Sequence, residues 1–154
     1  MITAGLEIRS AKQRDAEQLW KLIVSTFSVY EDQFVPSVLS KGKGDLVARC
    51  NSWSIGLVGG EIVAAVQHEV EQDIYTFSYL AVRSDMRRLG YGTQLYRYVE
   101  DCSRSKGRQI ILVAVRRAIE SNVKFVESLG FHFIGPFGSS GRHDIYGNEI
   151  GSAA

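Results

Sequence analysis

One segment near the middle of the chain constrains the fold most, because it joins a strand to a helix through a glycine-containing loop. The run 77–82 is apolar and β-prone, and the run 91–105 repeats apolar residues at helical spacing. The loop between them holds Arg87 and Arg88 and leads through Gly90 into the helix. A tight loop before a helix turns several backbone N–H groups toward one point, where the helix dipole adds partial positive charge. We therefore expect an anion to bind at this loop.

Two familiar phosphate-binding loops do not fit this segment. The Gly-Lys-Ser/Thr ending of the P-loop is absent, and Gly90-Tyr91-Gly92 lacks the third glycine and the later acidic residue of the dinucleotide-binding fingerprint. The adjacent arginines still favour a phosphate, because a guanidinium can bind one through two parallel hydrogen bonds. The alternative is a tight surface turn with two solvated arginines.

The loop resembles the acyl-CoA pyrophosphate loop of the GNAT superfamily of N-acetyltransferases. The family pattern is Arg/Gln-x-x-Gly-x-Gly/Ala, after a strand that ends in a small and a β-branched residue. Here Arg87-Arg88-Leu89-Gly90-Tyr91-Gly92 follows Leu80-Ala81-Val82. Ser128-Leu129-Gly130-Phe131 is similar to the family's Leu-Gly-Phe at the end of its last helix, so the resemblance extends over nearly the whole chain.

The order of the elements predicts an α/β (α+β layered) fold. The expected sheet is mixed and mostly antiparallel, with about six to seven strands, and about four helices flank it. Strands are predicted at 6–12, 53–58, 61–70, 74–82, 110–115, 131–134 and 143–146, and helices at 15–27, in one or two pieces within 35–50, at 91–105 and at 120–129. The resemblance adds that the two central strands splay apart.

Three details of this prediction can be tested separately. The continuously apolar run 110–115 is typical of a strand covered on both faces. The pair Gly135-Pro136 should end the strand before it, and residues 138–141 should form a flexible loop. The large aromatic residues are expected in the core: Trp20, Phe27, Trp53, Phe125 and Phe133.

Length and composition suit one domain over residues 1–154, with 45% hydrophobic residues and a net charge of +1. This balance gives no reason to expect nucleic acid or an anionic membrane as partner. No apolar run reaches membrane-spanning length and no secretory leader precedes the first strand, so we expect a soluble, cytoplasmic protein. The two cysteines, Cys50 and Cys102, suit packed thiols, and neither His132 nor His143 has a partner at ligand spacing, so no metal is predicted.

The resemblance implies that acetyl-CoA is the co-substrate. Its pantetheine arm would lie between the strand of Leu80-Ala81-Val82 and the strand of Val113-Ala114-Val115, and backbone groups would bond its amides. The family usually has an asparagine at the position of Ile119. Here Asn122 stands one helical turn later and could replace it. The predicted cofactor-binding residues are Leu80, Ala81, Val82, Arg87, Arg88, Leu89, Gly90, Tyr91, Gly92, Thr93, Asn122 and Phe125.

Acyl transfer to an amine needs both reactants held close, a deprotonated amine and donors for the oxyanion. The backbone N–H of Leu80 or Val82 is a candidate oxyanion donor. Many family members carry a glutamate in the strand before the loop, but residues 74–79 contain no carboxylate. The nearest candidate bases are His68 and Glu69, followed by Glu71 and Asp73. The alternative for each of them is a solvated side chain with no catalytic role. His68 is favoured because an unperturbed imidazole titrates near neutrality.

The usual proton donor to the leaving thiolate is also missing, because Val126 stands where the family has tyrosine. Ser121, Tyr79 or Tyr146 could supply the hydroxyl, and Tyr79 joins His68 and Glu69 as a candidate catalytic residue. Tyr30 and Phe34, like Tyr79, are candidates for contact with the acceptor. Arg116 and Arg117 follow the central strand, where they are either solvated or select an acceptor with a carboxylate or phosphate.

Three functions are compatible with these observations. The first is an N-acetyltransferase that moves an acetyl group from acetyl-CoA to a primary amine of a small molecule or peptide, by direct attack in a ternary complex. The second is a non-catalytic acyl-CoA-binding or regulatory domain, suggested by the missing glutamate and tyrosine. The third, a nucleic-acid-binding module, is disfavoured by the balanced charge. The acceptor stays open, as does a homodimer through the late strands, which is common among family relatives.

Overall fold

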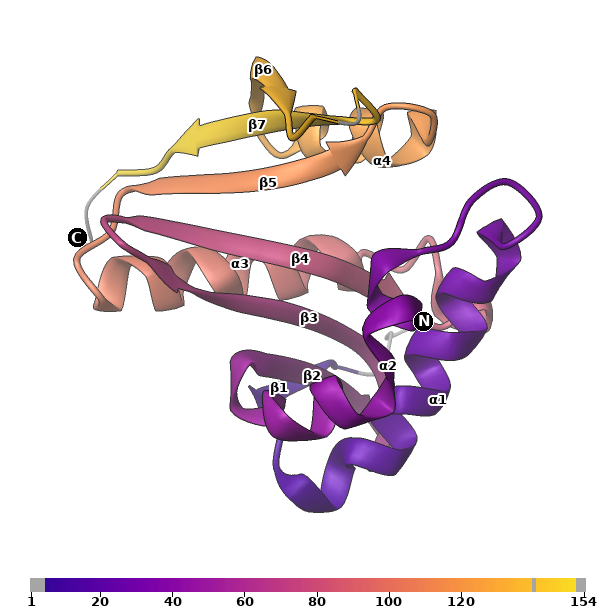
Figure 1. The fold of residues 1–154 in the computed structure, drawn as a ribbon. Helices are drawn as coiled ribbons and strands as arrows, with labels where there is room; N and C mark the ends of the chain where they lie inside the picture. The colour runs from indigo at the N-terminus through magenta and orange to yellow at the C-terminus, as the bar shows by residue number, and fades with distance from the viewer. Residues whose placement is uncertain (1–4, 140, 152–154) are drawn as a thin grey trace. The chain divides into compact units, whose positions relative to one another are not determined.

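The computed structural model of the protein describes residues 5–139 and 141–151 (Figure 1). Residue contacts group the chain into two compact units. The first contains the chain up to His68 together with Tyr79–Tyr98, and the second contains Glu69–Ser78 and the chain from Val99 onward. Among the described helices, none combines the length and apolar character needed to cross a membrane. That the chain forms a single domain stays a prediction.

An antiparallel meander begins in the first unit. Strand β1 (Glu7–Ser10) pairs with β2 (Trp53–Val58), which pairs in turn with β3 (Glu61–Glu71). The turn between β2 and β3 is made by Gly59 and Gly60, which both have positive φ, as hairpin turns of this kind require. These strands follow the predicted ranges closely.

Two helices of the same unit pack against its core. Helix α1 (Ala16–Phe27) buries the stripe that includes Leu19 and Ile23, which belong to one core cluster with Trp53. Helix α2 (Ser37–Ala48) is interrupted at Gly42, where φ is 83° and ψ is 171°. Side chains other than glycine rarely adopt such a φ, so the glycine is what allows the break. The prediction allowed one or two helical pieces, and the structure has two, on either side of Gly42.

The second unit contains most of the remaining elements. Strand β4 (Ile74–Val82) begins here and pairs in parallel with β5 (Ile110–Arg116) through Tyr75–Ile111 and Thr76–Leu112. Strand β7 (His143–Glu149) pairs antiparallel with both β5 and β6 (His132–Phe137), and the three strands lie side by side in Figure 1. The helices are α3 (Tyr91–Ser105), which begins in the first unit, and α4 (Glu120–Ser128).

The strand order confirms the predicted fold class. The strands form one seven-stranded sheet in the order β1-β2-β3-β4-β5-β7-β6. Its recorded pairs are antiparallel except for β4 with β5. A mixed, mostly antiparallel sheet with four α-helices is therefore present, as the order of elements predicted.

Two details of the predicted strands are wrong. Only one face of β5 is covered, because Ile111, Val113 and Val115 are buried whereas Ile110 and Ala114 are exposed. Strand β6 runs through Gly135-Pro136 to Phe137, with a register shift after Phe133. Proline is compatible with β6 because this strand lies at the edge of the sheet, where no ladder needs its missing N–H.

Strand β6 also explains why Phe133 does not join the core. Its side chain is 59% exposed and makes an edge contact with Tyr146, at 5.9 Å between ring centroids. Every residue of β6 is exposed or half-buried, so neither face of this strand is covered by the core. Within the predicted loop 138–141, Ser140 lies outside the described residues.

Candidate functional site

The loop that the sequence singled out lies between β4 and α3, in the first unit. After Val82 the chain forms a short 3₁₀ turn, Ser84–Met86, and α3 begins at Tyr91. Gly90 has a φ of 83°, and its carbonyl accepts the first helical bond from the N–H of Gln94, at 3.0 Å. The N–H groups of the first turn of α3 have no carbonyl one turn earlier in the helix, so they remain available to an anion.

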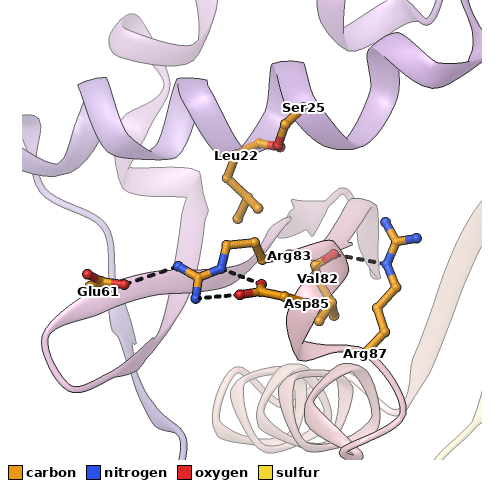
Figure 2. A network of polar contacts seen from close by, with 7 residues as sticks. All are labelled: Leu22, Ser25, Glu61, Val82, Arg83, Asp85 and Arg87. Atoms are coloured by element: carbon orange, nitrogen blue, oxygen red, sulfur yellow. Dashed lines mark hydrogen bonds and ion pairs between the residues drawn. The ribbon is translucent and has the colours of Figure 1, made fainter.

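Arg83 fixes the beginning of the loop, a role that the sequence analysis missed. Its guanidinium donates to Glu61 at 3.1 Å and to both carboxylate oxygens of Asp85, at 2.6 and 3.2 Å (Figure 2). Its backbone N–H donates to the carbonyl of Val63 on β3, at 2.7 Å. The hydrogen bond from Arg83 lowers the pKa of the Asp85 carboxyl. Two carboxylates therefore neutralise Arg83, and its role is to anchor the loop.

Arg87 and Arg88 differ from Arg83 in that neither has an ion-pair partner among the described residues. The Nε of Arg87 donates to the carbonyl of Val82 at 3.2 Å. The terminal nitrogens of Arg87 point away from Arg83 and its two carboxylate partners (Figure 2). Arg88 is exposed and has a φ of 64°, a left-handed conformation. Two uncompensated guanidinium groups thus lie next to the first turn of α3, an arrangement that favours a phosphate.

The other residues predicted at the loop contribute in different ways. Leu89 and Thr93 are exposed, as residues that contact a ligand must be. The side chain of Tyr91 is only 3% exposed, so Tyr91 and the glycines would offer backbone N–H groups alone. On β4, Ala81 is buried, whereas Leu80 and Val82 are half-buried. The Val82 carbonyl already accepts one hydrogen bond, from Arg87, and keeps a second lone pair.

Tyr79 has an unusual backbone conformation within β4, with a φ of 56°. A bulky residue in the left-handed region is an outlier that costs about 1–3 kcal/mol and persists only where its surroundings hold it. Backbone outliers of this kind cluster at active sites and ligand clamps. The outlier lies directly before Leu80, where the oxyanion donor is predicted.

The side chain of Tyr79 is held by aromatic and polar neighbours. Its ring stacks on Trp53 at 6.3 Å between centroids and meets Phe27 edge-on at 6.1 Å. Its hydroxyl lies 2.7 Å from Oγ of Ser37 and accepts a hydrogen bond from Nζ of Lys41 at 3.3 Å. Ser37 and Lys41 were not predicted, because only the fold brings α2 to the end of β4.

The two candidate bases on β3 have different surroundings. The Nε2 of His68 lies 2.6 Å from Oγ of Ser54, and its ring meets that of Tyr98 edge-on at 6.3 Å. Glu69 is the next residue, so its side chain leaves the opposite face of the strand. The backbone carbonyl of Glu69 accepts a hydrogen bond from Thr76. The side chains of His68 and Glu69 therefore lie on opposite faces of β3, and the role of each as a base stays a prediction.

Residues predicted on α4 and β7 belong to the second unit. Asn122 is exposed and Phe125 is half-buried, and their part in cofactor binding stays a prediction. Val126, at the position of the family's tyrosine, is buried in the core. Burial raises the pKa of the Tyr146 hydroxyl, and the nearby Glu127 raises it further. Tyr146 is thus a buried phenol that holds its proton more tightly than usual.

Arg116, the last residue of β5, and Arg117, which follows it, lie in a group of positive charges. Arg117 donates to both carboxylate oxygens of Asp144, at 3.0 and 2.6 Å, which lowers the pKa of that carboxyl. Burial, and then the charge of Arg142, lower the pKa of Arg116. Burial also lowers the pKa of His143, and Arg116 adds to this effect. Arg117 is therefore ion-paired and not simply solvated. Within residues 5–139 and 141–151, no three His, Cys, Asp or Glu side chains form a group suited to a metal.

Solved structures resemble this fold over nearly its whole length. The PaiA N-acetyltransferase of Thermoplasma acidophilum, in complex with coenzyme A, matches with a TM-score of 0.83 and 14% identity, over 95% of this chain and 99% of that one. The N-acetylglutamate synthase of Neisseria gonorrhoeae, complexed with coenzyme A and N-acetyl-glutamate, matches with a TM-score of 0.79 and 16% identity. That match covers 97% of this chain but only 36% of the synthase chain.

A third similar structure is that of a protein about as long as this chain. It is the ribosomal-protein-S18-alanine N-acetyltransferase of Escherichia coli, with a TM-score of 0.75 and 20% identity, and the match covers 97% of both chains. At these identities the likeness establishes the fold. No curated protein sequence matches the chain significantly.

The sequence itself carries the family signal. The profile of the Acetyltransferase (GNAT) domain matches residues 46–133, which is more than half of the chain. The matched segment contains β4, the arginine and glycine loop and α3, which are the elements that build the candidate anion site. With the fold, the loop and the profile in agreement, the chain belongs to the GNAT acetyltransferase family, whose members transfer acyl groups.

Proposed function

We propose that this protein is an N-acetyltransferase that moves the acetyl group of acetyl-CoA to a primary amine of a small molecule or peptide. The loop between β4 and α3 carries the proposal, because Arg87 and Arg88, which have no ion-pair partner among the described residues, adjoin the first-turn N–H groups of α3. The pyrophosphate of acetyl-CoA would bind there, and the family to which the chain belongs supports this assignment.

The amine attacks the thioester carbon directly in the ternary complex. The new C–N bond forms as the C–S bond breaks, and coenzyme A leaves as a thiolate that takes up a proton. Holding both reactants together is the main source of acceleration, and a backbone N–H near Leu80 stabilises the oxyanion. His68 is the proposed base for the ammonium proton, directly or through a water molecule.

A non-catalytic acyl-CoA-binding or regulatory domain is the second candidate. One observation favours it: the position of the family's tyrosine is occupied by Val126, whose side chain is buried in the core. No hydroxyl can act from that position. A coenzyme A thiolate is nevertheless a tolerable leaving group in water, so this loss alone does not decide between the two functions.

The deciding experiment measures thiol release from acetyl-CoA with a panel of amines, amino acids and peptides, and identifies acetylated products by mass spectrometry. An N-acetyltransferase releases thiol only when an acceptor is present, and the product is heavier by one acetyl group. An acetyl-CoA-dependent rise in melting temperature with no thiol release across the panel would instead favour the binding domain. If millimolar acetyl-CoA changes neither signal, both proposals fail.

A further inference from the structure

Three polar side chains converge beside the end of β4, outside the coenzyme loop. The hydroxyl of Tyr79 lies 2.7 Å from Oγ of Ser37 and 3.3 Å from Nζ of Lys41. Ser37 and Lys41 are one helical turn apart on the first piece of α2, so they share a face of that helix. All three residues belong to the first unit of the chain. We call this group the Lys41 cluster.

Aromatic neighbours hold Tyr79, the least exposed member of the Lys41 cluster, whereas Ser37 and Lys41 are exposed. Stacking on Trp53 and an edge contact with Phe27 hold the Tyr79 ring, and the left-handed backbone of Tyr79 leaves it little freedom. The ammonium of Lys41 lies 5.5 Å from the centroid of the same ring. Gly42 ends the first helical piece immediately after Lys41. A ring held in this way lets its hydroxyl bind a ligand with less loss of conformational entropy.

The charge of this cluster is not balanced. Lys43, two residues further along, is paired with Glu17. By contrast, no described carboxylate lies within ion-pair distance of Lys41, whose recorded partner is the neutral phenol of Tyr79. One ammonium and two hydroxyls therefore offer several hydrogen-bond donors at one place with no anion among them. A carboxylate or phosphate would complete such a set.

We propose that the Lys41 cluster binds the anionic group of the amine acceptor, so that the preferred substrates carry a carboxylate or phosphate close to the primary amine. The inference rests on the proposed acetyl transfer, because Tyr79 directly precedes Leu80, where the thioester is expected. Neutral amines would lose this contact. Polyamines would meet a like charge at Lys41, which disfavours them.

Matched acceptors test the preference directly. β-Alanine carries a carboxylate, phosphoethanolamine a phosphate, ethanolamine a neutral hydroxyl and putrescine a second ammonium. The wild-type enzyme should show a kcat/KM at least tenfold higher for β-alanine or phosphoethanolamine than for ethanolamine or putrescine. The better of the two anions identifies the chemistry of the acceptor. Equal or higher values for ethanolamine would overturn the inference.

Variants show whether Lys41 causes the preference for anionic acceptors. Lys41→Ala should raise KM for the anionic acceptors about tenfold, with little change in kcat, and should leave the values for ethanolamine unchanged. Lys41→Arg should restore most of the affinity. Lys43→Ala is the matched control, because it removes the same charge two residues away, and it should behave as wild type. A Lys41→Ala enzyme that loses activity equally for every acceptor would contradict the inference.

Binding without turnover separates this inference from the proposed function. Saturation-transfer NMR with phosphoethanolamine and β-alanine, in the absence of acetyl-CoA, should give a signal for wild type that Lys41→Ala weakens and Lys43→Ala keeps. If acetyl-CoA fails to bind while this signal persists, the proposed function is wrong and the anion site stands. If acetyl transfer occurs but the signal and the acceptor preference are both absent, the inference alone is wrong.

Discussion

The Nε of Arg87 donates a hydrogen bond to the carbonyl oxygen of Val82, at 3.2 Å, and so ties the loop between β4 and α3 to the last residue of β4. The terminal nitrogens of the same guanidinium remain directed away from the Arg83 anchor (Figure 2). Arg87 can therefore position the loop and bind phosphate at once. Arg88, which is exposed and left-handed, can only contribute its charge and its donors.

The first prediction follows from this difference. Arg88→Ala should weaken coenzyme A binding by about 1.5–3 kcal/mol, the usual contribution of hydrogen bonds to a charged group, which corresponds to roughly tenfold to hundredfold in Kd. Arg87→Ala should weaken binding at least as much, because it also releases the loop from Val82. Isothermal titration calorimetry with coenzyme A measures both effects. Lys106→Ala, which removes an exposed charge just beyond the far end of α3, should bind as wild type does.

A second prediction concerns the backbone of the loop. At Gly90 an added Cβ would meet nothing within 4 Å, but φ is 83°. Gly90→Ala should therefore destabilise the fold by about 1–2 kcal/mol through backbone strain, not through a clash. Gly44 in α2 is a suitable control, because its surroundings are equally open and no positive φ is recorded there. Gly44→Ala should be neutral or slightly stabilising in urea unfolding. Equal losses for the two variants would refute this account of Gly90.

The strand, loop and helix of residues 74–105 could be predicted from sequence because their signals are local, whereas coenzyme binding at this loop stays a prediction. The arginines, the glycines and the strand and helix on either side all lie within 74–105, and the observed bounds of β4 and α3 match the predicted ones. The break in α2 was predictable for the same reason, since Gly42 permits a conformation that other residues avoid.

What sequence could not show depends on partners far along the chain. Nothing in the sequence distinguishes Arg83 from Arg87 and Arg88. Its pairing with Glu61, which only the fold shows, makes it an anchor of the loop. Lys41 and Ser37 become notable only because folding places them at Tyr79, about forty residues away. The exposure of Phe133 was missed because an apolar pattern does not reveal which strand lies at the edge of a sheet.

A third prediction concerns pH and the ion pair at the start of α1. The carboxylate of Asp15, which is buried, accepts hydrogen bonds from Arg9 at 2.7 and 3.0 Å and from the N–H of Lys12 at 2.8 Å. The bond from Arg9 is the main reason why the pKa of Asp15 lies below its ordinary value of 3.8. The stability that this group contributes is therefore complete above that value and is lost as the pH falls through the lower pKa of the folded state.

Asp15→Asn should lower the free energy of unfolding by roughly 1.5–3 kcal/mol at neutral pH, because hydrogen bonds to a charged group are lost. The gap between wild type and variant should stay constant down to about pH 5 and shrink below about pH 4. Urea unfolding at several pH values measures it. A gap that widens on acidification would have the wrong sign for a carboxyl with a lowered pKa.

A fourth prediction tests His68 as the general base. His68→Gln should lower the rate at limiting acceptor by roughly 10²–10⁴-fold, the usual contribution of such a base, and should remove the decline of the wild-type rate on the acid side. Ser54→Ala removes the partner at 2.6 Å from Nε2 and should have a smaller effect. A loss of that size at Glu69, Glu71 or Asp73 instead would move the assignment to that carboxylate. If single replacements of His68 and of the three carboxylates all leave the rate within a few-fold, no general base is needed. Proximity and the oxyanion donor then suffice for catalysis.

The location of coenzyme A is the central claim, and an NMR titration tests it most directly. Adding coenzyme A to ¹⁵N-labelled protein should shift the backbone amide signals of Tyr91, Gly92 and Thr93 first and most strongly, because these N–H groups would bond the pyrophosphate. Amides of β1, which carries no predicted coenzyme-binding residue, serve as the internal reference for non-specific changes. If millimolar coenzyme A leaves the three amides unmoved, or shifts a different region of the protein instead, the account is contradicted.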